Sequence, residues 1–223
     1  MVAPSSQPMN SSGFATGAIF LDRDGVINRN RDDHVKSWRE FTFMPTVLES
    51  VRRLTETGLP IFIITNQAVV SRGLASEDDI HEIHARMAEA IAEAGGRIAR
   101  VYHCPHDAHE DCDCRKPKPG MLLQAQADFG INLSRSFMVG DAWTDIEAGL
   151  SVGARCILVM TGRGQRQFAQ TWSRFPVRFG AACDLADATN MILDTLNGQE
   201  ADSTPRLRRA FHLALNPQEL NVL

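Results

Sequence analysis

The sequence predicts an α/β protein built on a parallel β-sheet with helices on both faces. Two observations support this prediction. Short apolar runs of strand length alternate along the chain with segments whose apolar residues recur at helical spacing. One of the runs, LPIFIITN at residues 59–66, is rich in β-branched residues, as is typical of a buried strand. Strands that alternate with helices favour a parallel sheet covered on both faces.

The N-terminal half of the chain supplies the first elements. AIFLD (18–22) is the first predicted strand. A helix closed by Gly58 follows, indicated by the helical spacing of Val47, Leu48, Val51 and Leu54. After the strand at 59–66, residues 77–94 are predicted to be helical, with Ser76 as the cap and acidic residues in the first turn.

The C-terminal half repeats this pattern. IARVYHC (98–104) is the third predicted strand, and a helix at 119–129 has Pro119 at its start. Two more strands are predicted around a helix near 144–151, at 136–141 and 155–160. From there to about residue 197, weaker signals indicate one more strand and one more helix.

Length and composition indicate one ordinary globular domain. The chain has 223 residues, of which 43% are hydrophobic and 22% charged. Its net charge of −4 offers no general basic field for nucleic acid. We expect a leader at 1–16, a domain at 17–197 and a polar tail at 198–223, and we expect a monomer.

The beginning of the sequence lacks the basic residues and apolar run of a signal peptide. No stretch approaches the roughly 20 apolar residues that span a membrane. We therefore expect a cytoplasmic protein that acts on a small molecule, with neither a membrane nor a nucleic-acid partner. In a reducing compartment, clustered cysteines are more often metal ligands than disulfides.

Two acids follow the first predicted strand. Asp22 and Asp24 in FLDRDGVIN are two residues apart, which places both carboxylates on the same side of the chain. Their repulsion either raises one pKa or recruits a cation. One carboxylate is then suited to attack phosphorus and the other to carry a proton. An acidic turn capped by Gly25 is the alternative for this motif taken alone.

Three further strand ends or helix starts carry polar groups suited to a phosphate. Thr65 and Asn66 end the second strand and offer a hydroxyl and an amide. Lys116 precedes a predicted helix start and is suited to neutralise charge on a phosphoryl group. Asp141 ends the fourth strand, with Asp145 four residues on, as a site for Mg²⁺. Singly, each also fits a turn, a cap or a solvated charge.

The loop CPHDAHEDCDC supplies a separate set of metal ligands at residues 104–114. Cys104, His106, Cys112 and Cys114 provide three thiolates and one imidazole, a closed tetrahedral set for structural Zn²⁺. Surface or supporting positions are expected for the neighbouring histidines, His103 and His109. Because Cys114 directly precedes Arg115 and Lys116, we expect the zinc loop to hold the backbone from which both cations project.

Together these motifs resemble the haloacid dehalogenase (HAD) superfamily of phosphohydrolases over roughly residues 17–197. DRDGVIN, TNQ, CDCRKPKPGM and VGDAWTDIEAG resemble two related groups within it. These are the D-glycero-D-manno-heptose 1,7-bisphosphate 7-phosphatases, which the motifs favour, and the histidinol-phosphate phosphatases. The resemblance implies a HAD-like, Rossmann-type sheet with a zinc loop and no large cap domain.

The resemblance also implies roles in a Mg²⁺-dependent phosphatase with an aspartyl-phosphate intermediate. Asp22 would be the nucleophile and Asp24 the general acid and base. Thr65 and Lys116 would hold the transferring phosphoryl group. The expected Mg²⁺ ligands are Asp22, the backbone carbonyl of Asp24, and Asp141, with Asp145 in support.

Substrate binding beyond the reacting phosphate is expected from Asn66 and Arg115. Arg115 is the best-placed residue to bind the second phosphate of a bisphosphate through two parallel hydrogen bonds. A histidinol-phosphate phosphatase would need an acid for the amine instead, so Arg115 favours the sugar.

Two other classes of protein remain as alternatives. One is a receiver domain, which also combines an acceptor Asp with Mg²⁺, Thr and Lys, but lacks an acid two residues after the acceptor. The other is a non-catalytic zinc module, which would be expected to lack one of the residues Asp22, Asp24, Lys116 or Asp141. All four are present.

Overall fold

A computed structural model describes residues 16–199 of the chain. The expected leader, except residue 16, and the expected tail, except residues 198 and 199, lie outside the described residues. Within residues 16–199, none of the helices combines the length and the apolar character needed to cross a membrane.

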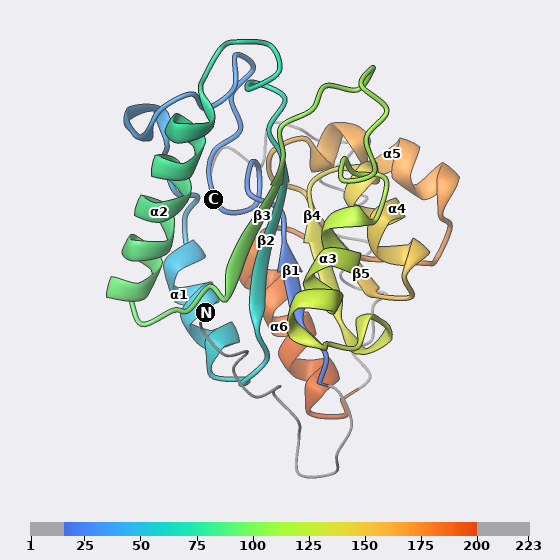
Figure 1. Cartoon of the computed structure of the whole chain (residues 1–223). Helices are drawn as coiled ribbons and strands as arrows, with labels where there is room; N and C mark the ends of the chain where they lie inside the picture. The colour runs from blue at the N-terminus through green and yellow to red at the C-terminus, as the bar shows by residue number, and fades with distance from the viewer. Residues whose placement is uncertain (1–15, 200–223) are drawn as a thin grey trace.

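A six-stranded parallel sheet forms the centre of the described fold (Figure 1). Its order is β3-β2-β1-β4-β5-β6. The strands are β1 (Ile19–Leu21), β2 (Ile61–Asn66), β3 (Arg100–Cys104), β4 (Phe137–Gly140), β5 (Arg155–Val159) and β6 (Gly180–Ala182). Every strand of the described residues belongs to this sheet, so no cap domain with a sheet of its own lies within 16–199.

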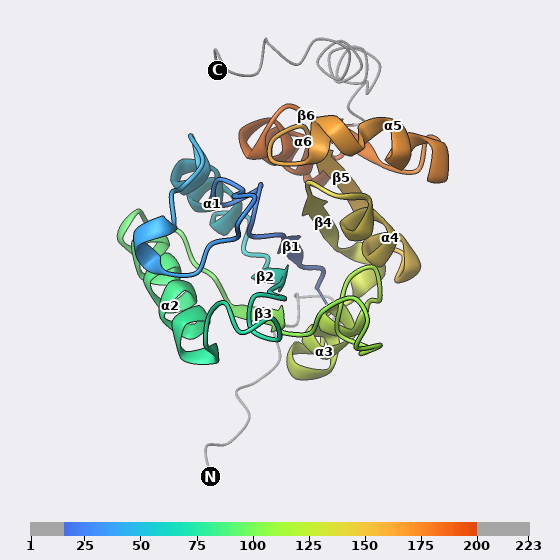
Figure 2. The same ribbon diagram turned by 90° about the horizontal axis from the view of Figure 1, so that it is seen from above.

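Helices cover both faces of the sheet (Figure 2). One face packs against α1 (Val47–Thr55), α2 (Glu77–Glu93) and α6 (Leu185–Leu196). The other packs against α3 (Gly120–Phe129), α4 (Trp143–Ser151) and α5 (Gly164–Arg174). Ile19 and Leu21 of β1 join the first core and Phe20 the second, as the alternation of side chains along a strand requires.

Most sequence-based elements are confirmed, with boundaries that differ by one or two residues. Ser76 caps α2 as predicted: its hydroxyl accepts from the backbone N–H of Asp79, whose carboxylate accepts in return from the N–H of Ser76. Pro119 is the residue before α3 rather than its first residue. Two short 3₁₀ helices, Trp38–Glu40 and Leu133–Arg135, were not predicted.

The prediction of a single helix after β5 was wrong. The structure has two, α5 and α6, on either side of β6. Helix α5 is largely polar. Its fully buried side chains are those of Phe168 and Thr171, and Trp172 packs partly buried against the same core. One buried apolar side chain in three turns is too weak a periodic signal to read from the sequence.

Candidate active site and metal centre

One pocket opens at the carboxyl edge of the sheet. With a volume of about 540 Å³, it is of a size typical of small-molecule sites. All the predicted chemical residues outside the cysteine-rich loop line it: Asp22, Asp24, Thr65, Asn66, Arg115, Lys116, Asp141 and Asp145. The sheet order brings them together, because β1 lies between β2 and β4 at the point where the strand order reverses.

Three buried carboxylates surround one buried ammonium at the bottom of this pocket. Asp22, Asp141 and Asp145 each have a carboxylate oxygen within 4.8 Å of the others. Lys116 Nζ lies 2.9 Å from Asp22 Oδ1 and 2.6 Å from Asp145 Oδ1. It also donates to the backbone carbonyl of Ile64 at 2.8 Å. Lys116 therefore forms ion pairs with two of the three acids, Asp22 and Asp145.

The electrostatics of this group reflect its excess of negative charge. Burial raises the pKa of Asp22 to about 6, with Lys116 opposing the shift and Asp145 adding to it. Burial, followed by the charges of Asp22 and Asp145, raises the pKa of Asp141 well above its ordinary value. For Lys116, burial lowers the pKa, but the two carboxylates outweigh it and the net shift is upward.

The donor set fits a hard divalent cation. Asp145 Oδ1 is buried, and beyond its 2.6 Å ion pair with Lys116 Nζ it has no hydrogen-bond partner among the described residues. Carboxylate oxygens are the ligands that Mg²⁺ prefers, and a bound cation would relieve the repulsion among the three acids. Asp22, Asp141 and Asp145 are therefore suited to hold Mg²⁺.

Two glycines leave room for the carboxylate of Asp141. Gly25 and Gly162 have φ angles of +90° and +56°, and a Cβ atom at either residue would collide with Asp141 Oδ2. The same oxygen accepts from the backbone N–H of Arg163 at 2.7 Å. Backbone from two loops thus encloses this acid, which requires glycine at both positions.

Asp24 faces a different set of partners from the other acids. Arg23 Nη2 donates to both of its oxygens at 2.9 and 2.8 Å. Asn28 Nδ2 and Gln67 Nε2 also donate to it, each at 2.8 Å. Burial raises the pKa of Asp24, but Arg23 and the two amides outweigh it, so the net shift is downward. Of these two acids, Asp22 is therefore the one with the raised pKa, and burial rather than the charge of Asp24 is the main cause.

The sequence motifs predict no role for these partners of Asp24. Arg23 is fully buried, its Nη1 lies 3.3 Å from Nε2 of His84, and its Nε has no hydrogen-bond partner in the described structure. Arg23 belongs to the motif DRDGVIN and Gln67 to the motif TNQ. Arg23 stands between two acids, directly after a buried strand. Because an arginine is rarely buried unless it is paired, this position indicates an ion pair with one of the two acids.

Thr65 and Asn66 lie where the second strand meets the pocket. Thr65 is buried, and its hydroxyl accepts from Gln67 Nε2 at 2.8 Å. The Asn66 amide binds the backbone of Lys116 in both directions, donating to its carbonyl and accepting from its N–H, each at 3.1 Å. Asn66 thus positions Lys116 while it lines the pocket.

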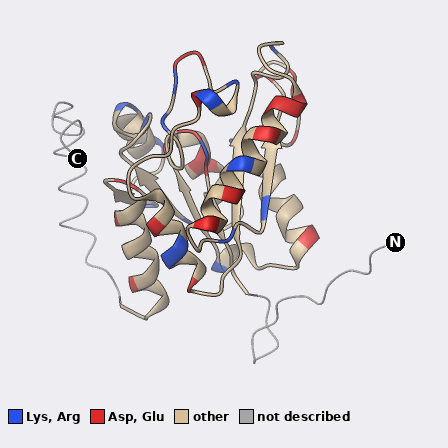
Figure 3. Ribbon diagram, turned by 90° about the vertical axis from the view of Figure 1, so that its left-hand side faces the viewer, with Lys and Arg blue, Asp and Glu red and all other residues tan. Residues whose placement is uncertain are grey.

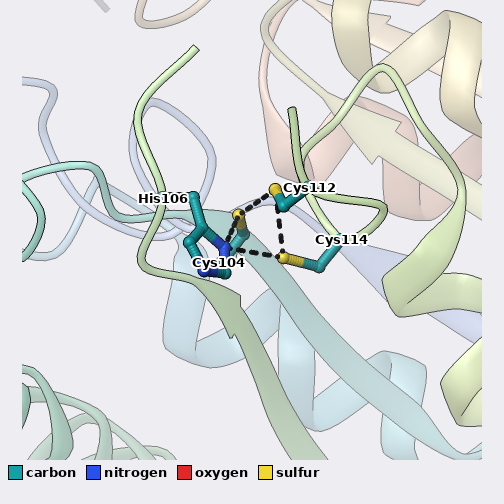
Figure 4. A group of neighbouring side chains, drawn as sticks. All are labelled: Cys104, His106, Cys112 and Cys114. Atoms are coloured by element: carbon teal, nitrogen blue, oxygen red, sulfur yellow. Dashed lines mark hydrogen bonds between the residues drawn. The ribbon is translucent and has the colours of Figure 1, made fainter. Parts of the chain in front are cut away.

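The four predicted zinc ligands converge beside the pocket (Figure 4). The sulfur atoms of Cys104 and Cys112 are 3.5 Å apart, and those of Cys112 and Cys114 are 3.4 Å apart. His106 Nδ1 lies 3.6 and 3.3 Å from the sulfurs of Cys104 and Cys114. Ligands about 2.0–2.3 Å from a tetrahedral Zn²⁺ lie roughly 3.5–3.8 Å from each other. The donor types and spacing therefore fit Zn²⁺.

Cationic side chains occupy the rim of the pocket. Arg115 follows the Cys/His cluster and donates from Nη1 to the carbonyl of His106 at 2.8 Å. Arg72 pairs with Asp107 of the same loop through two bonds of 2.6 and 3.0 Å, and its Nη1 lies 3.0 Å from His34 Nε2. The rim also includes Arg163. This distribution suits an anionic group bound above the carboxylates.

A protein-family model matches part of this chain. The model is described as HAD-hydrolase-like and matches residues 113–188. The matched segment runs from within the cysteine-rich loop into α6 and includes Lys116, Asp141 and Asp145.

Similar proteins cover most of the described fold. The D-glycero-β-D-manno-heptose-1,7-bisphosphate 7-phosphatase of Pseudomonas aeruginosa is 41% identical over 148 residues, 66% of this chain and 83% of the relative. The enzyme of the same name from Neisseria meningitidis serogroup B is 35% identical over 184 residues, 82% of this chain and 98% of the relative.

A solved structure has a similar fold. The D,D-heptose 1,7-bisphosphate phosphatase from B. bronchiseptica, complexed with magnesium and phosphate, superimposes with a TM-score of 0.76 and 34% sequence identity. The match covers 81% of this chain and 99% of that one.

Proposed function

This chain belongs to the HAD superfamily of phosphatases, and from that premise we propose that it removes the 7-phosphate of D-glycero-β-D-manno-heptose 1,7-bisphosphate. The main support is the pocket in which Asp22, Asp141, Asp145 and Lys116 meet beneath a cationic rim. The choice of substrate rests on the relatives, which are 7-phosphatases of this bisphosphate. The cationic side chains of the rim are suited to bind its second phosphate.

Asp22 is the proposed nucleophile. One of its carboxylate oxygens forms the bond to phosphorus, and the bond from phosphorus to the sugar oxygen breaks. Asp24 gives its proton to the departing sugar oxygen. The carboxylate of Asp24 then takes a proton from water, whose oxygen bonds to phosphorus and releases Asp22.

This cycle requires Asp24 to hold a proton when substrate is bound. Arg23 keeps the pKa of Asp24 low in the structure without substrate. A phosphate dianion beside the carboxylate acts in the opposite direction, because a nearby like charge favours the neutral form of an acid. Arg23, Asn28 and Gln67 hold the carboxyl group in place in either state.

Lys116 and Thr65 are proposed to hold the oxygens of the transferring phosphoryl group. The ammonium of Lys116 is already at the carboxylate that attacks, 2.9 Å from Asp22 Oδ1. Its charge would stabilise the additional negative charge that develops on the phosphoryl oxygens. Asn66 would contribute through the backbone of Lys116 as well as by lining the pocket.

Two metal ions are proposed as cofactors. Mg²⁺ would be held by Asp22, Asp141 and the backbone carbonyl of Asp24, with Asp145 in support, and would reduce the repulsion between Asp22 and a phosphate dianion. Zn²⁺ would be held by Cys104, His106, Cys112 and Cys114. With four protein ligands this second site has a structural rather than a catalytic character.

Arg115 is proposed to bind the 1-phosphate of the substrate at the rim. Its guanidinium is tied to the zinc loop through the carbonyl of His106, which leaves further N–H groups for an anion. Arg72 and Arg163 are the other cationic lining residues on this rim. The expected monomeric state and cytoplasmic location stay predictions.

Phosphate release from a panel of substrates tests the proposal. The panel contains the α and β anomers of the heptose bisphosphate, the heptose 7-phosphate and histidinol phosphate, each with Mg²⁺ and with the zinc loop loaded. We expect the highest kcat/KM for the β bisphosphate, with the heptose 1-phosphate as product by ³¹P NMR. A preference for histidinol phosphate, or release of the 1-phosphate, would refute it.

A further inference from the structure

A second group of metal-binding side chains lies outside the pocket. Glu77 and His81 of α2 meet His103 of β3, and the three residues offer ligand atoms that lie within 4.8 Å of one another. Glu77 Oε2 is 2.8 Å from His103 Nε2. None of the three belongs to the pocket lining or to the Cys/His cluster.

The secondary structure places these three residues together. Glu77 and His81 are four residues apart on a helix, so their side chains lie on one face, a turn apart. His103 precedes Cys104 in a strand, and neighbouring strand residues point to opposite faces. Cys104 therefore faces the zinc loop while His103 faces α2.

The spacing of the rings agrees with shared coordination of one ion. A metal–nitrogen bond of about 2.0–2.1 Å puts each ring centre roughly 3.2 Å from the ion, so two imidazoles at a tetrahedral angle have centres about 5.2 Å apart. The ring centroids of His81 and His103 are 5.4 Å apart. His81 is exposed, so its side chain can rotate and bring the two ring centroids from 5.4 Å to the roughly 5.2 Å expected for two imidazoles on one ion.

The surroundings favour a cation. The acidic residues of α2 outnumber its single basic residue, Arg86, and Figure 3 shows these acidic positions along the helix that faces the viewer. The side chains of Glu77 and His103 are 45% and 14% exposed, so the group is reached from solvent at its outer side. A local negative field raises the concentration of cations at such a place.

We propose that Glu77, His81 and His103 form a second site for a divalent transition-metal ion, with Zn²⁺ or Co²⁺ as occupants. Two imidazoles and one carboxylate suit these ions better than Mg²⁺, which prefers oxygen ligands alone. Three protein ligands leave one position open to water. Water at this position can exchange with solvent, whereas the closed Cys/His cluster has no such position. This proposal does not depend on the proposed substrate.

A simple ion pair between Glu77 and a protonated His103 is the competing explanation of the 2.8 Å contact. It gives His81 no part in cation binding. Removing the His81 imidazole therefore separates the two explanations, and the exposed position of His81 on α2 makes a folded His81→Ala variant the expected result.

Cobalt binding to the intact protein tests the site. Protein with zinc in the Cys/His cluster and with Mg²⁺ in large excess is titrated with Co²⁺ and followed by visible absorption. We expect about one additional equivalent of Co²⁺ per chain, with d–d bands and no thiolate-to-cobalt charge transfer, because the ligands are nitrogen and oxygen. His81→Ala and Glu77→Gln should each raise the Kd at least about tenfold.

Glu89→Gln is the matched control, because Glu89 is another exposed acid of α2 outside the group. It should bind Co²⁺ as the wild type does, and far-UV circular dichroism should show unchanged helix content in all three variants. The same Kd in wild type and His81→Ala, or no additional equivalent in the wild type, would overturn the proposal.

Discussion

Arg23 Nη2 binds both carboxylate oxygens of Asp24, the next residue in the chain, at 2.9 and 2.8 Å. The arginine is fully buried beneath the pocket, whereas the Asp24 side chain is 22% exposed at its surface. Gln67 extends the contact by donating to Asp24 and to Thr65. The carboxyl group proposed to carry protons is thus held by buried donors, and substrate can approach it from the open side.

Replacing Arg23 with methionine should destabilise the protein. The change removes the buried partner of Asp24, and such a loss costs about 3–5 kcal/mol, with the lower end expected for a partly exposed acid. Urea unfolding measures the free energy of unfolding. Arg86→Met is the control, because its i,i+4 pair with Glu82 is exposed and worth only about 0.3–0.5 kcal/mol. Equal stability of the two variants would contradict the assigned role of Arg23.

Asp22→Asn should abolish turnover without unfolding the protein. The nucleophile is lost, so kcat should fall at least about 10³-fold. In the absence of Mg²⁺ the melting temperature should stay the same or rise, because burial and neighbouring acids disfavour the Asp22 anion. Phosphate release and thermal unfolding are the two measurements. Residual hydrolysis at the wild-type rate would rule out Asp22 as the nucleophile.

Gly25→Ala should cost both stability and activity. A Cβ atom there collides with Asp141 Oδ2, and φ is +90°. Gly58→Ala is the control, since its φ of +75° carries similar backbone strain, about 1–2 kcal/mol, but nothing lies within 4 Å. Both variants should therefore lose stability, and Gly25→Ala alone should need more Mg²⁺ for half-maximal activity. The same Mg²⁺ dependence in both would show that Asp141 is not a ligand.

Removing zinc should lower activity even when Mg²⁺ is saturating. Structural zinc contributes an apparent ~10–16 kcal/mol in small zinc-binding peptides, so the loop that ends at Cys114 should lose its order without the ion. Lys116 lies two residues further on and should be misplaced. A chelator selective for zinc should reduce kcat and the melting temperature together, and added Zn²⁺ should restore both. Full activity in zinc-free protein would show that the zinc-bound loop is not needed to position Lys116.

Arg115→Lys should weaken binding of a bisphosphate more than that of a monophosphate. A lysine keeps the charge but loses the paired N–H geometry, and a hydrogen bond to a charged group is worth about 1.5–3 kcal/mol, roughly 10- to 150-fold in KM. The heptose 7-phosphate serves as the internal control, since a general disturbance of the loop would slow both substrates. Equal effects on the two would place the distal phosphate elsewhere.

Strand ends could be predicted because their signals are local. The apolar run before Asp22 and the one before Asp141 each mark a buried strand, and both acids lie at the pocket as expected. The Cys/His cluster could be predicted for the same reason, since Cys104 ends β3 and His106 and Cys114 follow within the next ten residues. Helix α5 escaped prediction because few of its residues are apolar.

By itself, the sequence determined which chemical groups stand at the ends of the strands and in the cysteine-rich loop. Only the tertiary structure decided which of them touch. The parallel order of the strands brings Lys116 to Asp22 and Asp145 and places His103 of β3 against Glu77 of α2. Periodicity reports the environment of one segment at a time, whereas these contacts and the resulting pKa shifts depend on burial and distance between segments far apart in the chain.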